Sequence, residues 1–459
     1  MSEETIEITP KEKSSRLKEF ISNPRKGLWT LAIPTMLGMV VQTVYIIVDM
    51  IFVGRISGDA LTALAFNMPL IFFATGISFG LGIGVTATIA KFIGAERKQS
   101  ADNSAEHAVM LGVIIGSFFT FIGLLWGKRF LSTLGVPPNL LELAWSYFRI
   151  MATGHIFVVM SIFFRSILSG EGDMKTPMLI QGGSTLLNII LDPILIFGLG
   201  MGVRGAALAT VVSAGVSASA FAYFLLVKGH AYIAFTLKDF KISREIVEKI
   251  FKIGIPSSFS MVIMSLGSGA FNKILISFSG DPVAAYQVGH RVDHFFLMPA
   301  IAIASSAVTL VGMFYGAKRR DLLQQIIKYG MSRAVYIGLG MGAIIFTFAP
   351  QIMSAFSDDV GIVTAGVHYL RIMVFSYPFI AISMMSGRIL QGLGHGMPML
   401  VITFLRVLLV SILLAYVFVY WLNKPVEWVW IAMLTSMIFS AGIGYLWLTF
   451  GLRRISREL

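Results

Sequence analysis

The sequence contains no cysteine and few charged residues. The absence of cysteine excludes disulfides, thiolate metal sites and thiol nucleophiles from the 459 residues. Only 13% of the residues are charged and 56% are hydrophobic, whereas about one quarter of the residues of a soluble domain are charged. This imbalance excludes an ordinary soluble protein and indicates a chain that lies in lipid.

Apolar runs of about 20 residues recur along the chain, and each is long enough to cross the hydrocarbon core of a membrane. Because lipid offers the backbone no hydrogen-bonding partner, we expect these runs to be helices. The predicted spans are residues 28–53, 61–90, 106–126, 141–169, 177–199, 203–227, 253–279, 283–313, 328–349, 363–391, 398–421 and 427–450. The predicted fold class is an all-α polytopic membrane protein with 12 transmembrane helices.

The two halves of the chain are similar at a constant spacing, which is 256 − 34 = 222 residues for Pro34 and Pro256. Tyr147 and Tyr369 recur at this spacing, as do Gly58-Asp59, Gly94-Ala95, Arg149 and Gly170. Such self-similarity indicates a duplicated structural unit. Because each half holds an even number of spans, we expect two parallel six-helix repeats around a central cleft, and a chain that functions as a monomer.

The duplication divides the chain into lobes and connections. We expect an N-terminal segment at 1–27, an N-lobe at 28–227, a linker at 228–252, a C-lobe at 253–450 and a tail at 451–459. Lys and Arg gather in the two terminal segments and the linker, and this bias predicts a multi-pass protein of the cell membrane with both termini in the cytoplasm. The formal charge of +12 therefore reflects contact with the bilayer, and we expect no nucleic-acid partner.

Few carboxylates lie inside the predicted spans. Of the 24 Asp and Glu residues, only Asp49, Asp192 and Asp293 lie well within one. Because a charge at membrane depth is costly unless it faces protein or water, these three are candidate functional groups. The rise of a helix places Asp49 and Asp192 roughly 6–10 Å below the outer boundary. Their equivalents in the second half are Phe271 and Leu414, so the second lobe lacks this pair.

Oxygen-bearing side chains accompany the two acids of the N-lobe. Asn188 precedes Asp192 by one helical turn and shares its face, and Thr210 lies at a similar depth. Together with Asp49 they form an all-oxygen set, which suits a hard cation such as Na⁺ and also suits a shared proton. We therefore predict a cation-binding site of Asp49, Asn188, Asp192 and Thr210. The alternative is that the carboxylates only bond neighbouring helices.

Two further features lie beside these acids. Gln42 and Tyr45 share a helix face with Asp49, which makes them candidate contacts to a substrate or to the ion ligands. Pro34 interrupts the first span, and Pro193 interrupts the fifth. Because proline removes a backbone donor and kinks a helix, we predict gating kinks at both, although membrane helices often tolerate proline without such a role.

The second lobe carries its own polar cluster, Lys273, His290, Asp293 and His294. We prefer an ion pair between Lys273 and Asp293 to a second ion path, and we assign no metal to the two histidines because no Glu follows the first as in a zinc hydrolase helix. The spans contain no Ser/His/Asp order and no phosphate loop. We therefore expect no enzymatic activity and no cofactor other than a coupling ion, Na⁺ or H⁺.

Taken together, these features resemble the multidrug and toxic compound extrusion (MATE) transporters. The resemblance covers nearly the whole chain and is carried by the six-plus-six pattern, Pro34, the Gln42, Tyr45 and Asp49 stripe, Val53-Gly54, Asn188, Asp192-Pro193 and Thr210. The chain is most similar to the DinF-like branch, whose N-lobe holds a cation site of two Asp, an Asn and a Thr. The resemblance thus implies the same four ligands, Asp49, Asn188, Asp192 and Thr210.

The resemblance also implies a function. Transporters of this family export bulky, often cationic organic compounds by antiport against Na⁺ or H⁺, through a cleft that opens alternately to either side. Lys273 stands where other branches carry an acid, which disfavours an ion route through the C-lobe. The rival interpretation is a flippase for a lipid or a lipid-linked oligosaccharide, for which Arg165, Arg388 and Lys273 could supply a cationic cleft.

Overall fold

The computed structural model describes residues 16–228, 232–235 and 240–458. Within this part of the chain, twelve helical segments are long and apolar enough to cross a membrane, which confirms the predicted number of spans. Residues 1–15 of the predicted N-terminal segment and residues 229–231 and 236–239 of the predicted linker lie outside the described residues.

The N-lobe follows a short helix, α1 (Leu17–Ser22). Its six long helices are α2 (Pro24–Gly54), α3 (Gly58–Gly94), α4 (Lys98–Thr133), α5 (Pro138–Gly170), α6 (Lys175–Pro193) and α7 (Val203–Ala222). Two π-helical turns, η1 (Ile194–Gly198) and η2 (Tyr223–Val227), extend α6 and α7. Several helices are longer than the predicted spans. A helix can continue beyond the lipid through polar turns, and a search for apolar runs does not detect these turns.

The C-lobe repeats this arrangement with more interruptions. It begins with α8 (Arg244–Leu275), α9 (Gly280–Gly316) and α10 (Arg320–Ser354). The tenth span consists of α11 (Val360–Met373) and α12 (Tyr377–Gly392), joined by the 3₁₀ turn η4 (Val374–Ser376). The last two spans are α13 (Met397–Phe404), η5 (Leu405–Ile412), α14 (Leu413–Tyr416), η6 (Val417–Trp421) and α15 (Glu427–Glu458).

The duplication extends to single backbone angles. Glu96 and Lys318, which are 318 − 96 = 222 residues apart, each have a φ of 56°. Gly172 and Gly394 stand at the same spacing, with φ of 86° and 97°. A positive φ is uncommon for residues other than glycine, so its recurrence at equivalent positions shows that the repeat is structural as well as sequential.

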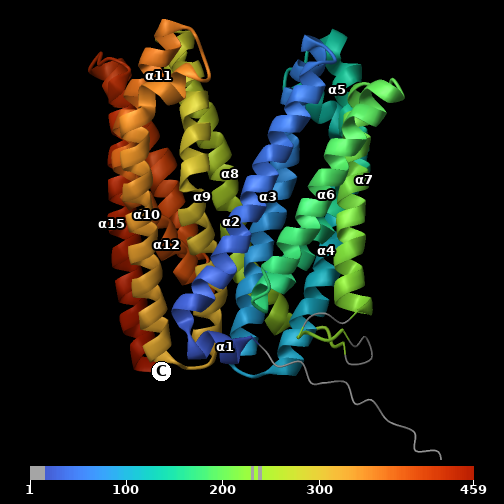
Figure 1. The fold of residues 1–459 in the computed structure, drawn as a ribbon, viewed down its shortest axis with the longest axis vertical. Coiled ribbons are helices and arrows are strands. Elements are labelled where there is room, and N and C mark those ends of the chain that lie inside the picture. Colours follow the sequence, from blue (N-terminus) through green and yellow to red (C-terminus); the bar gives the residue numbers. More distant parts are fainter. Residues whose placement is uncertain (1–15, 229–231, 236–239, 459) are drawn as a thin grey trace, which may run out of the picture.

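The two lobes meet near the end of the molecule that holds α1 and the C-terminus, and they diverge toward the opposite end (Figure 1). We call the end that holds α1 and the C-terminus the terminal end. Helix α3 packs against α8 and α9, and α2 packs against α9. The contact is close enough that a Cβ on Gly84 would lie 2.2 Å from the carbonyl oxygen of Ile250. On the other side of this contact, a Cβ on Gly254 would lie 2.8 Å from Cα of Leu81. The absence of side chains thus lets the two backbones touch.

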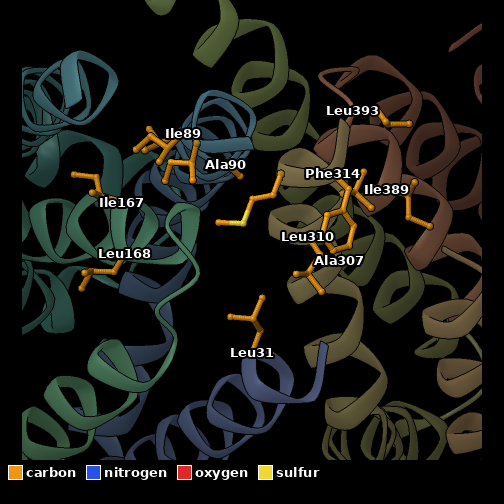
Figure 2. Packing of buried hydrophobic residues seen from close by; sticks show 14 of the residues in the cluster. Leu31, Ile89, Ala90, Ile167, Leu168, Ala307, Leu310, Phe314, Ile389 and Leu393 are labelled. Atoms are coloured by element: carbon orange, nitrogen blue, oxygen red, sulfur yellow. The ribbon is translucent and has the colours of Figure 1, made fainter. Parts of the chain in front are cut away.

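One apolar cluster joins both lobes. Figure 2 shows side chains from both lobes, among them Leu31 and Ile89 of the N-lobe and Leu310, Phe314 and Ile389 of the C-lobe, and all five are buried in the same cluster. Dense packing of this kind stabilises one relative position of the lobes, because separating them would forfeit many van der Waals contacts. In this structure the terminal end is therefore closed.

Candidate functional site

The predicted acid pair lies in the half of the N-lobe that faces away from the terminal end. Asp49 is near the last turn of α2, and Asp192 is near the end of α6. Helix α6 packs against both α2 and α7, so the three helices form one side of the lobe. Both carboxylates are buried, with exposures of 8% for Asp49 and 0% for Asp192. The structure also gives the two acids an electrostatic interaction with one another.

Asn188 connects Asp192 to α7. With its amide oriented so that Nδ2 faces the acid, Asn188 donates a hydrogen bond to Oδ2 of Asp192 at 3.1 Å. In the same orientation its Oδ1 accepts from the backbone N–H of Thr210 at 3.2 Å. The other carboxylate oxygen of Asp192, Oδ1, is buried and has no hydrogen-bond partner among the described residues. A buried acceptor without a donor is costly, so this oxygen is positioned to bind a proton or a cation.

The stripe on α2 faces the same two helices. Tyr45 shares a hydrogen bond of 3.2 Å with the hydroxyl of Thr210 on α7. One turn earlier, Gln42 accepts a hydrogen bond of 2.8 Å from Nε2 of Gln181 on α6. Gln42 and Tyr45 therefore join α2 to the helices that carry the other predicted ligands.

Two residues of this region were not predicted from the sequence. Gln181 lies seven residues before Asn188, so its spacing along α6 could have placed it on the same face. Tyr147, on α5, is buried and interacts electrostatically with Asp49, Tyr45 and Asp192. Its recurrence as Tyr369 in the second repeat was the only signal that it holds a special position.

This arrangement provides oxygen atoms from three helices. Among the described residues, no ion pair joins Asp49 or Asp192 to a lysine or an arginine. Carboxylate, amide and hydroxyl oxygens are ligands that hard cations prefer, and two carboxylates at low dielectric cannot both be charged without a compensating positive charge. The chemistry of these side chains is therefore compatible with a bound hard cation or with a proton on one of the acids.

The two predicted gating prolines differ in their local structure. Pro34 lies inside α2, which continues as one helix from Pro24 to Gly54. Pro193 is the last residue of α6 and is followed directly by the π-helical turn η1. Because such turns widen the helix and often occur at functional sites, the break beside Asp192 is the more pronounced of the two.

The predicted ion pair in the C-lobe is wrong. Asp293 is buried and accepts hydrogen bonds of 2.6 Å from the hydroxyls of both Tyr369 and Tyr377. Lys273 is exposed, and no ion pair between it and Asp293 occurs among the described residues. The prediction assumed that the two residues face one another, whereas α9 is rotated so that Asp293 points toward the tenth span.

The neighbouring histidines do not share the environment of Asp293. His290 and His294 are exposed, and the ring of His290 lies 5.9 Å from that of Tyr286. Within the part of the chain that the structure describes, no three His, Asp or Glu side chains gather as a metal site. The predicted polar cluster is therefore divided into one buried acid and three exposed bases.

The arginines that could line a cationic cleft have partners within their own lobes. The guanidinium of Arg165 lies 5.0 Å from the ring centre of Phe79, also in the N-lobe. Arg388 donates a hydrogen bond to Gln391 one turn along α12. Both contacts hold the guanidinium groups against side chains of their own lobe.

Known proteins resemble this chain over nearly its whole length. It is 27% identical over 450 residues to "Probable multidrug resistance protein NorM" of Thermotoga maritima, covering 95% of this chain and 94% of that protein. Among solved structures, a MOP superfamily transporter from Pyrococcus furiosus is 31% identical, with a TM-score of 0.93 over 97% of this chain and 100% of that one. Its description infers a different function from the reversed polarity of its binding pocket.

A second solved structure is described as the outward-facing conformation of a multidrug resistance MATE family transporter. It is 32% identical, with a TM-score of 0.92, over 97% of this chain and 99% of that one. The sequence model of the MatE family matches the chain twice, at residues 34–194 and 256–417, once in each repeat. The two matches start 222 residues apart, as the duplication requires, and the chain belongs to the MatE family of transporters.

Proposed function

We propose that this protein is a secondary active multidrug antiporter, which exports organic, often cationic compounds in exchange for Na⁺ or H⁺. The observation that most supports this proposal is the buried pair Asp49 and Asp192, in which Oδ1 of Asp192 has no hydrogen-bond donor among the described residues. Similar proteins are named for multidrug resistance or for multidrug export, which supports the choice of cargo. We propose that Asn188 and Thr210 complete the ion site, and that the chain works as a monomer in the cell membrane.

The orientation follows from charge. If the positive connections lie in the cytoplasm, the terminal end is cytoplasmic and the acid pair lies toward the outside. The structure then has its cytoplasmic end closed, so that an ion enters the acid pair from outside. Binding of the ion favours one position of α2 against α6 and α7, and the substrate favours the other. By reciprocal linkage each ligand then promotes release of the other.

The test is efflux of a fluorescent organic cation from liposomes that hold the purified protein, under an imposed gradient of Na⁺ or H⁺. We expect gradient-driven efflux, reduced at least about tenfold by Asp49→Asn or Asp192→Asn. The matched control is Asp59→Asn, because Asp59 is exposed at the start of α3. The ion whose gradient drives transport is the coupling ion.

Efflux that persists unchanged in both acid variants would contradict the assigned ion site. No efflux under either gradient, combined with movement of headgroup-labelled lipid across the same liposomes, would favour the flippase instead.

A further inference from the structure

A cavity of about 660 Å³ lies at the terminal end, away from the acid pair. Its wall combines Lys91 and Phe92 of α3, in the N-lobe, with Lys249 and Lys252 of α8 and Trp447 of α15, in the C-lobe. The cavity therefore crosses the boundary between the lobes, and its shape depends on their relative position. We call it the basic cavity.

The lining of the basic cavity is positively charged. Lys91, Lys249, Lys252 and His395 contribute to its wall, and the described lining residues include no Asp or Glu. Glu245 pairs with Lys249 from one turn earlier on α8, outside the lining. Several lysines around one hollow attract an anion, and the attraction persists where nearby protein and lipid exclude water.

Aromatic rings hold two of these lysines in place. Nζ of Lys91 lies 4.5 Å from the ring centre of Tyr315 on α9, across the boundary between the lobes. Nζ of Lys249 lies 4.8 Å from the ring centre of Phe92 on α3, across the same boundary in the other direction. Each lobe thus presents an ammonium group to a ring of the other lobe, which brings both charges to the same place.

Most of the rest of the wall is apolar. It includes Leu390, Leu393, Pro398, Trp447 and Phe450. Phe450 is 62% exposed on a helix that is long and apolar enough to span the membrane, so this side of the cavity adjoins lipid. A ligand that matches both parts of the wall has an anionic head and a hydrocarbon body.

We propose that the basic cavity binds the phosphate headgroup of an anionic phospholipid, with its acyl chains along the apolar wall. Basic hollows between helices at the headgroup level of a membrane suit such lipids. Only the assignment to the cytoplasmic leaflet rests on the proposed orientation, so the binding does not depend on the transport function.

Occupation of this cavity has a consequence for the lobes. A headgroup that contacts Lys91 and Lys252 at the same time bridges α3 and α8. It binds the state with a closed terminal end more tightly than a state in which these helices separate, and it shifts the population toward the closed state. The lipid would then act as a regulator of lobe opening.

The test is thermal unfolding of the purified full-length protein in detergent, titrated with dioleoylphosphatidylglycerol, with dioleoylphosphatidylcholine or with inorganic phosphate. We expect the anionic lipid to raise the melting temperature more than the zwitterionic lipid, and the gain to shrink at high salt. In the double variant Lys91→Gln/Lys252→Gln the apparent Kd for the anionic lipid should rise about tenfold or more.

The matched control is Lys175→Gln/Lys328→Gln, because both lysines are exposed at the terminal end and neither lines the cavity. If the double variant fails to fold, Lys252→Gln alone should raise the apparent Kd roughly fivefold, since Lys252 is exposed. Equal stabilisation of both double variants by the anionic lipid would overturn the proposal. Equal stabilisation by inorganic phosphate would also overturn it, in favour of a site for a soluble anion.

Discussion

Gly94 and Gly316 occupy equivalent positions of the two repeats, and each packs against the main chain of the other repeat. A Cβ on Gly94 would lie 1.9 Å from the carbonyl oxygen of Met313, and one on Gly316 would lie 2.1 Å from that of Lys91. Since 313 − 91 = 222, the two contacts are related by the duplication itself. The closed terminal end is therefore built around a pair of reciprocal backbone contacts that only glycine permits.

We expect Gly94→Ala to open the terminal end. The added methyl group cannot fit beside a carbonyl oxygen, and overpacking of this kind costs about 1–3 kcal/mol. Because the chain has no cysteine, Thr88→Cys supplies a single thiol at a buried position in the wall of the basic cavity. The measurement is the rate at which maleimide labels this thiol, which should rise several-fold with Gly94→Ala.

The control for this experiment is Gly182→Ala, where a Cβ would meet nothing within 4 Å. Unchanged labelling in the Gly94 variant, with a lowered melting temperature, would show that the contact serves stability alone and does not hold the lobes closed.

The hydrogen bond from Asn188 to Asp192 should tune the ion site. In Asn188→Ala, Oδ2 of Asp192 loses its donor, so the charged acid is less stabilised and the ligands are less well oriented. We expect the concentration of coupling ion that gives half-maximal efflux to change about tenfold, while the maximal rate changes less. The control is Asn139→Ala, since Asn139 is exposed on α5. An unaltered ion dependence would remove Asn188 from the site.

Asp293 should matter for stability more than for ion coupling. Tyr377→Phe removes one of the two hydrogen bonds to this buried carboxylate, with an expected loss of about 1–2 kcal/mol. Because Tyr369 and Tyr377 lie on either side of η4, the melting temperature should fall as the broken tenth span loosens. Tyr445→Phe, at an exposed position, should leave it unchanged. Efflux that loses its dependence on the ion gradient in Asp293→Asn would instead indicate a second ion site in the C-lobe.

Glu171 should make the attachment of the linker sensitive to pH. This residue follows α5 outside the spans, is buried, and accepts a hydrogen bond of 3.3 Å from the backbone N–H of Ile233. Burial, together with a smaller effect of the nearby Asp173, raises the pKa of Glu171 to about 7, although the N–H of Ile233 and the charge of Arg16 oppose the rise. The folded protein thus binds this proton more tightly than the unfolded chain.

A raised pKa in the folded state means that the contribution of Glu171 to stability is complete below its ordinary pKa of 4.5 and is lost as the pH rises to about 7. This contribution is at most about 3 kcal/mol. We expect the melting temperature to fall between pH 5 and pH 8, and to fall less in Glu171→Gln, which stays neutral. Glu142→Gln, at a largely exposed position, is the control. The same pH dependence in wild type and Glu171→Gln would refute this role.

The polar residues of the N-lobe show which parts of the candidate site could be predicted from the sequence. The depths of Asp49 and Asp192 followed from their distances to the ends of their spans, because helix rise is nearly constant. Tyr147 and Gln181 could not be assigned to the site in this way, since their approach depends on which faces of α5 and α6 are turned inward. The same uncertainty in rotation explains why Lys273 was wrongly paired with Asp293.

The sequence by itself determined that this chain crosses lipid twelve times and consists of two related halves, because apolar length and repeat spacing are properties of residue order alone. Only the tertiary structure decided that the repeats touch through Gly94 and Gly316, that Asp293 bonds two tyrosines, and that lysines of both lobes surround one cavity. These contacts join residues far apart in the chain. They depend on the rotation of each helix about its axis and on where the lobes meet, and neither quantity is recorded in the order of the residues.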